Sequence, residues 1–171
     1  MKEKARIATV WLDGCSGCHM SILDLDEALA GVFEQADIVY GPLVDAPHFP
    51  EGVDVTLVEG AVSNQDDLRL VQAVRRHSRL VVSLGDCAVT ANVPGMRNGI
   101  PVPQLLKFVY PDGVPKENVP ALLNRAVPVH EIVPVDIFVP GCPPKPDAIG
   151  YLLGELLAGR KPELARKVKF G

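Results

Sequence analysis

Short apolar runs rich in β-branched residues alternate along the chain with stretches in which apolar residues recur at helical spacing. The short runs predict strands at residues 7–11, 36–40, 53–58, 80–84 and 135–139. The periodic stretches predict helices at residues 21–30, with Ser21 as the expected cap, at residues 64–78 and from Pro146 or Asp147 onward. Strands that alternate with helices favour a parallel sheet with right-handed crossovers and helices on both faces. The predicted fold class is therefore α/β, a flavodoxin-like, doubly wound parallel sheet.

Residues 91–133 interrupt this alternation, and most of them lie in a stretch (94–146) that is rich in proline and glycine. Short turns of helix are predicted at residues 105–108 and 119–124, so this part is expected to be an irregular but ordered insertion. The flavodoxin-like domain is predicted to cover residues 1–159. Residues 160–171 then form a tail with five basic residues and one acidic residue. Such a tail is either simply solvated or a docking contact on a partner.

Composition narrows the class of protein. A chain of 171 residues with 47% hydrophobic and 22% charged residues suits one domain with a real core. A net charge of −4 gives no reason to expect nucleic acid or a membrane surface as a partner. No apolar stretch approaches the roughly 20 residues of a membrane span, and the segment before the first strand has no room for an export leader. We therefore expect a cytoplasmic protein, in which cysteines are metal-binding or catalytic rather than paired in disulfides.

The chain has four cysteines, and each follows a predicted strand in a segment that contains glycine or proline: Cys15, Cys18, Cys87 and Cys142. Because the carboxyl ends of parallel strands meet at one edge of a sheet, the four thiols are predicted to form one site. Glu59 also ends a strand and is expected near them.

Several kinds of thiol site fit this pattern. Four thiolates hold a 4Fe–4S cluster, and the neighbouring glycines let the backbone approach its sulfurs (Gly14, Gly17, Gly85 and Gly141). A structural zinc site with four cysteines usually has two close pairs, whereas only Cys15 and Cys18 are close here. A thioredoxin-like dithiol at Cys15 and Cys18 leaves the other two cysteines unexplained. Cys87 or Cys142 as a merely buried apolar residue is the remaining alternative.

Three polar residues near the thiols are candidates for a supporting role. Glu59 either carries protons, supports the site from the side, or is a solvated or capping carboxylate. Asp86 is expected to order the segment of Cys87, and His19 either donates a hydrogen bond to a cluster sulfur or only begins a helix. The sequence has no GxGxxG, P-loop, Ser/His/Asp or HExxH pattern and nothing that specifies a flavin, so it shows no substrate chemistry of its own.

Four motifs carry a resemblance to a known family: CSGCHMSILDLDEAL, VEGAVS, GDCAVTANVPGMRN and VPGCPPKPDAI. In this order they resemble the small subunit of nickel–iron hydrogenases, in particular that of the soluble NAD-reducing enzyme, over residues 7–159. The resemblance implies that the four cysteines bind the 4Fe–4S cluster nearest the nickel–iron centre and that Glu59 lies close to that cluster. The homologous subunit of respiratory complex I has adjacent first cysteines, so the two residues between Cys15 and Cys18 favour hydrogenase.

The resemblance also implies partners. The nickel–iron centre is expected in a separate large subunit, and FMN with further iron–sulfur clusters in diaphorase subunits that reduce NAD. Because no cysteine follows Cys142, this chain is expected to hold one cluster and to relay electrons between these partners. The alternatives are a quinone-linked subunit like that of complex I and a structural zinc protein with four cysteine ligands.

Overall fold

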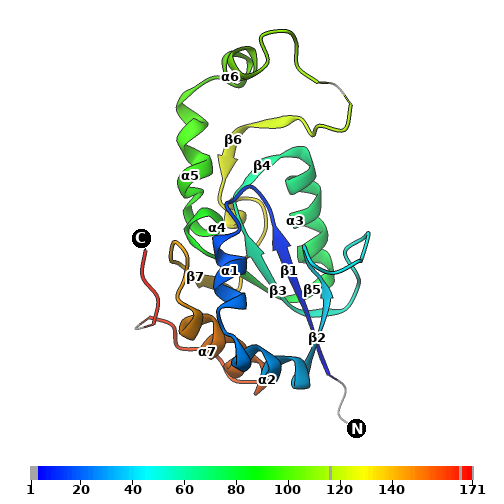
Figure 1. Ribbon diagram of the computed structural model, residues 1–171, viewed down its shortest axis with the longest axis vertical. Coiled ribbons are helices and arrows are strands. Elements are labelled where there is room, and N and C mark those ends of the chain that lie inside the picture. Colours follow the sequence, from blue (N-terminus) through cyan, green and yellow to red (C-terminus); the bar gives the residue numbers. More distant parts are fainter. Residues whose placement is uncertain (1–3, 116, 166, 171) are drawn as a thin grey trace.

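The computed structural model describes residues 4–115, 117–165 and 167–170. Its centre is a five-stranded sheet, in the order β2-β1-β3-β5-β7, in which all neighbours are parallel (Figure 1). The strands are β1 (Ala5–Trp11), β2 (Ala36–Tyr40), β3 (Val53–Glu59), β5 (Ser78–Leu84) and β7 (Ile137–Val139). Counted within this sheet, the order is the flavodoxin-like 2-1-3-4-5. The predicted fold class is confirmed.

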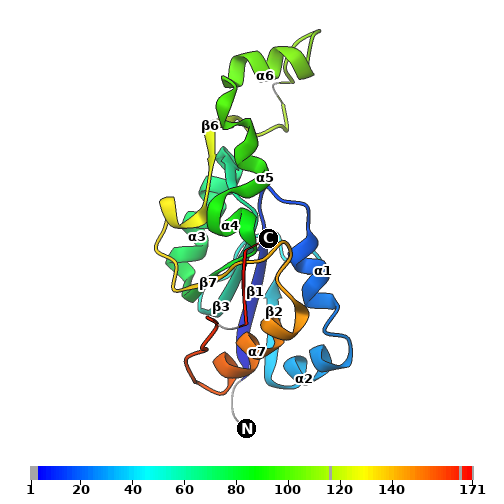
Figure 2. The ribbon, with the colours of Figure 1, turned by 90° about the vertical axis from the view of Figure 1, so that its left-hand side faces the viewer.

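Helices cover both faces of the sheet. On one face lie α1 (Gly17–Leu23), α2 (Glu27–Gln35) and α7 (Pro146–Leu157), and on the other lies α3 (Gln65–His77) (Figures 1 and 2). Neighbouring strand residues point to opposite faces, so Leu57 packs in the core cluster with Ile149 while Val58 packs in the cluster with Val71. The near-continuous apolar strands predicted from the sequence follow from this two-sided burial.

The predicted helix at residues 21–30 is wrong, because two helices occupy this part of the chain. α1 begins earlier, at Gly17, and the chain turns sharply at Asp26, whose φ is 48°, before α2 begins. The helix predicted at residues 64–78 is confirmed as α3. Its N-terminus is closed by a capping box, in which the Asn64 side chain accepts from the backbone N–H of Asp67 and the Asp67 side chain accepts from that of Asn64.

The insertion contains more regular structure than the sequence predicted. It comprises α5 (Asn92–Gly95), η1 (Met96–Gly99), α6 (Val102–Val109), β6 (Leu122–Val127) and η2 (Val129–Glu131), and it directly follows α4 (Asp86–Thr90). From α5 to β6 it rises beyond the carboxyl ends of the central strands (Figure 2). β6 pairs antiparallel with β4 (Val62–Asn64), a strand that the sequence did not reveal.

The helical turn predicted at residues 119–124 is wrong, because hydrogen bonds from η1 hold this segment as a strand. The Asn98 side chain donates to the carbonyl oxygen of Ala126 and accepts from its N–H, both at 2.8 Å. Arg97 donates to the carbonyl oxygens of Ser63 and Leu123, and so joins β4 to β6. Long-range bonds of this kind override local propensity. Across the described residues, no helix has both the length and the apolar character needed to cross a membrane.

Candidate metal centre

The four cysteines lie just beyond the carboxyl ends of three central strands. Cys15 lies between β1 and α1, and Cys18 lies in the first turn of α1. Cys87 lies in the first turn of α4, after β5, and Cys142 lies in the loop between β7 and α7. Two cysteines that were expected in loops therefore begin short helices. All four are free; Cys18 is buried, Cys87 is partly buried, and Cys15 and Cys142 are exposed.

Electrostatic interactions indicate that the four thiols lie close enough to influence one another. Burial raises the pKa of the Cys18 thiol, and the charges of Glu59 and the other three cysteines raise it further. Burial is also the main cause that raises the pKa of Cys87, with smaller contributions from Cys142, Cys15 and Glu59. Within the described part of the chain, no three or more His, Cys, Asp or Glu side chains are placed to hold one metal ion. The thiols therefore gather without converging on a single point.

Glu59 caps the helix that carries Cys18. Its buried carboxylate, 2% exposed, accepts from the backbone N–H of Cys18 at 3.4 Å and of His19 at 2.9 Å. The Nδ1 atom of His19 contacts the same carboxylate. These N–H groups belong to the first turn of α1 and have no partner inside the helix. A carboxylate from the end of β3 thus fixes where α1 begins, which explains why Ser21 is not its cap.

Asp86 joins the segment of Cys87 to the loop of Cys142. Its Oδ1 atom accepts from the backbone N–H of Gly141 at 2.6 Å, and its own N–H donates to the carbonyl oxygen of Gly141 at 2.9 Å. The N–H of Gly85 donates to the carbonyl oxygen of Val139 at 2.8 Å. The peptide bond between Cys142 and Pro143 is cis. Asp86 is thus held against the loop of the fourth cysteine as well as beside Cys87.

Gly85 is required by the close approach of two segments. Its φ of 84° is unfavourable for residues with a side chain, and a Cβ atom there would collide with the Cys18 sulfur.

Sequence reasoning missed Asn92, whose side-chain amide lies 3.8 Å from the Cys142 sulfur as a donor. Its position in the segment after Cys87, GDCAVTAN, was the available signal.

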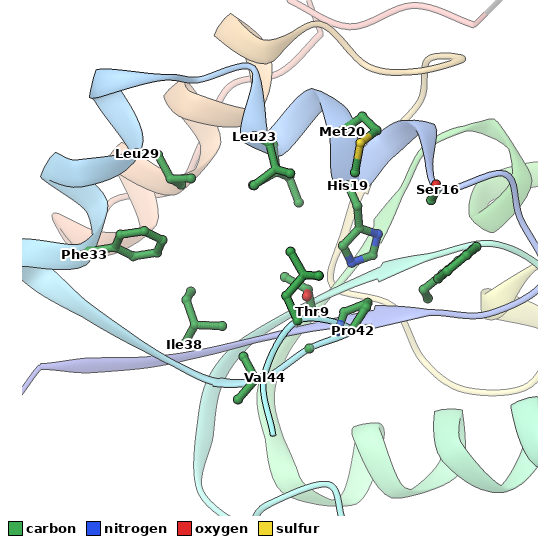
Figure 3. A pocket seen from close by; sticks show the side chains of 14 residues that line it. Thr9, Ser16, His19, Met20, Leu23, Leu29, Phe33, Ile38, Pro42 and Val44 are labelled. Carbon is green, nitrogen blue, oxygen red and sulfur yellow. The ribbon is translucent and has the colours of Figure 1, made fainter. Parts of the chain in front are cut away.

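An apolar cavity of about 360 Å³ adjoins the Cys18 side of the site (Figure 3). The His19 ring projects into it on the side of Thr9 and Pro42 (Figure 3). Its Nε2 atom is buried and has no hydrogen-bond partner among the described residues. The cavity wall also includes large apolar side chains that are exposed: Trp11, Met20, Leu23, Phe33 and Leu43.

Comparison with known proteins places the chain in a family. The family described as "NADH ubiquinone oxidoreductase, 20 Kd subunit" matches residues 15–156. A subunit of the F420-non-reducing hydrogenase vhu of Methanococcus voltae is 41% identical over 98% of this chain and 61% of its own length. NAD-reducing hydrogenase HoxS subunit delta of Cupriavidus necator is 34% identical over 96% of this chain and 84% of its own. The chain thus spans only about three fifths of the Methanococcus relative.

Solved structures agree with these relatives. A chain of an NAD⁺-reducing [NiFe]-hydrogenase in the H₂-reduced state matches with a TM-score of 0.94 and 37% identity, over 99% of this chain and 100% of that one. A chain of the Dm. baculatum [NiFeSe]-hydrogenase, 18% identical with a TM-score of 0.62, shares the fold. The protein therefore belongs to the family of the complex I 20 kDa subunit and the nickel–iron hydrogenase small subunits, and it is a homologue of a subunit of NAD-reducing hydrogenase.

Proposed function

We propose that this chain is the electron-transfer subunit of a nickel–iron hydrogenase and holds one 4Fe–4S cluster by Cys15, Cys18, Cys87 and Cys142. The observation that carries the proposal is the gathering of four free thiols from three strand ends around one buried carboxylate. Cysteine thiolates are the usual ligands of such clusters. When bound, the cluster supplies a centre that takes up and releases electrons, and its iron ions favour the thiolate form of Cys18 that burial opposes.

The neighbouring polar residues position the ligands. Glu59 holds Cys18 through the first turn of α1, and Asp86 holds the loop of Cys142. We infer a positioning role for Glu59, because both of its carboxylate oxygens accept hydrogen bonds from α1. His19 supports Glu59 from the side of the apolar cavity.

The proposed relay needs partners at both ends. A large subunit would hold the nickel–iron centre, and diaphorase subunits with FMN and iron–sulfur clusters would reduce NAD in the cytoplasm. The exposed apolar side chains around the cavity suit a surface that a permanent partner covers. The names of the relatives support the hydrogenase assignment, since they include NAD-reducing and F420-non-reducing hydrogenases.

Metal and sulfide analysis of the chain purified with its catalytic subunit tests the proposal. We expect about four irons and four sulfides per chain, and an EPR signal that Cys87→Ala removes together with hydrogen-dependent NAD reduction. One zinc per chain without sulfide would establish the structural zinc alternative instead. Iron with quinone reduction but no hydrogen oxidation would place the protein with the complex I branch. Normal hydrogen-dependent NAD reduction by Cys87→Ala would refute the relay.

A further inference from the structure

A second groove, also of about 360 Å³, lies directly beside Cys142. Its walls are the loop that carries Cys142 (residues 140–145) and residues 167–169 of the tail. Lys145, Lys167 and Lys169 line it, and we call it the lysine groove. In Figure 1 the tail, drawn in red, rises from α7 toward the level of β7 and α4. Cys142 and all three lysines are exposed, so the groove opens on solvent beside a proposed cluster ligand.

The tail is held in place on the body of the protein. Leu164 and Val168 pack against the core cluster that contains Ile149 and Leu152. The backbone N–H groups of Lys167 and Val168 donate to the carbonyl oxygen of Leu164, at 2.7 and 3.2 Å. The Lys167 ammonium lies 4.3 Å from the centre of the Tyr151 ring, a cation–π contact. Lys167 therefore has a defined position against the Cys142 loop, and Lys169 lies farther along the same wall of the groove.

The lysine groove is positive on a chain that is negative overall. Among the described residues, none of the three lysines forms an ion pair, whereas Arg75 pairs with Asp136. The acidic residues nearest to them in sequence, Asp147 and Glu163, are exposed and do not line the groove. With a net charge of −4 for the whole chain, this concentration of unpaired positive charge attracts an acidic surface.

We propose that the lysine groove docks an acidic face of the protein that exchanges electrons with the cysteine site; this inference rests on the proposed relay function. Charge complementarity steers diffusional encounter and fixes orientation more than it adds affinity. Docking here would bring the partner against Cys142, an exposed member of the site, so that the electron path is short. The tail then acts as a docking contact, which is one of the two roles expected from its composition.

Binding of an acidic two-cluster ferredoxin, used as the probe, tests the docking surface. The chain purified with its catalytic subunit is titrated by calorimetry in about 50 and 200 mM salt, since surface attraction is screened over this range. We expect binding that weakens with salt. The variant Lys145→Glu, Lys167→Glu, Lys169→Glu should bind about tenfold or more weakly in low salt and lose most of the salt dependence.

The matched control reverses three exposed charges elsewhere: Arg76→Glu on α3, Lys107→Glu on α6 and Lys161→Glu early in the tail. It changes the net charge equally and should bind ferredoxin like the unmodified protein. Equal weakening in both variants, or in neither, would overturn the docking surface. So would displacement of ferredoxin by inorganic phosphate at millimolar concentration, which would make the groove a small-anion site. The iron content of the same samples tests the proposed relay separately. If the chain holds no iron but still binds ferredoxin through these lysines, the relay is refuted and the docking surface is not.

Discussion

The Cys18 side and the Cys142 side of the thiol site are built differently. Cys18 is buried, its helix is capped by the buried carboxylate of Glu59, and the adjoining cavity is apolar. Cys142 is exposed, its loop is held by Asp86, and the adjoining groove is lined by lysines. An apolar surface suits a permanent subunit contact, whereas a charged surface suits a contact that forms and dissolves. The difference fits the proposed relay if the catalytic subunit lies on the Cys18 side and the electron partner on the Cys142 side.

The largest loss of stability is expected from a substitution at Gly85, where the Cys18 side and the Cys142 side meet. A Cβ atom at this position would collide with the Cys18 sulfur and approach the carbonyl oxygen of Gly141, at a positive φ of 84°. Gly85→Ala should therefore lower the free energy of unfolding by about 3 kcal/mol, from overpacking and backbone strain together. The iron content of the purified protein should fall with it.

Gly154→Ala, in α7, is the control, because a Cβ atom there meets nothing within 4 Å. It should leave the iron content unchanged and raise helix stability by up to about 1 kcal/mol. Urea unfolding and iron analysis measure both quantities. Full iron occupancy in Gly85→Ala would contradict the conclusion that the close approach of Gly85 to the Cys18 sulfur is needed for the site.

Smaller losses of stability are expected at Glu59 and Asp86, and the two losses should differ. Both oxygens of Glu59 accept hydrogen bonds, so the amide of Glu59→Gln turns one acceptor into a donor that faces a backbone N–H. We expect a cost of about 2 kcal/mol, as for a buried donor left unpaired. In Asp86→Asn the Oδ1 atom can still accept from Gly141, so the cost should be nearer 1 kcal/mol.

Chemical denaturation of the two variants under one set of conditions gives this comparison, with the rate of iron loss to a chelator as a second measurement. Iron should be lost faster from Glu59→Gln than from Asp86→Asn. The opposite order would mean that the Cys142 loop, and not the first turn of α1, is the more demanding part of the site.

Sequence reasoning predicted the Cys18 side and the Cys142 side to different degrees. Apolar runs and helical periodicity are local signals, so the central strands and α3 were predicted correctly. The start of α1 was not, because its cap comes from Glu59, on a strand 40 residues away from His19 in the chain. A distant carboxylate leaves no local pattern, and Ser21 gave a misleading one.

The pairing of β4 with β6 and the lysine groove escaped prediction for the same physical reason. β6 is a strand because Asn98 and Arg97 hold its backbone, and the groove exists because Leu164 and Val168 pack the tail against the core. The strand-end rule predicted which edge of the sheet carries the thiols. This rule does not predict the surfaces beside the thiols, because those surfaces depend on tertiary packing.

The smallest effect on the stability of this chain is expected at Leu43, on the apolar cavity. Its side chain is 83% exposed, so Leu43→Glu should change the free energy of unfolding by no more than about 0.5 kcal/mol. If the catalytic subunit covers this side, the same change buries a charge in an apolar interface and should reduce co-purification of that subunit several-fold. Leu43→Met keeps the surface apolar and should co-purify normally. Undiminished co-purification by Leu43→Glu would remove the apolar side from the subunit interface, and the proposed placement of the partners would then rest on the lysine groove alone.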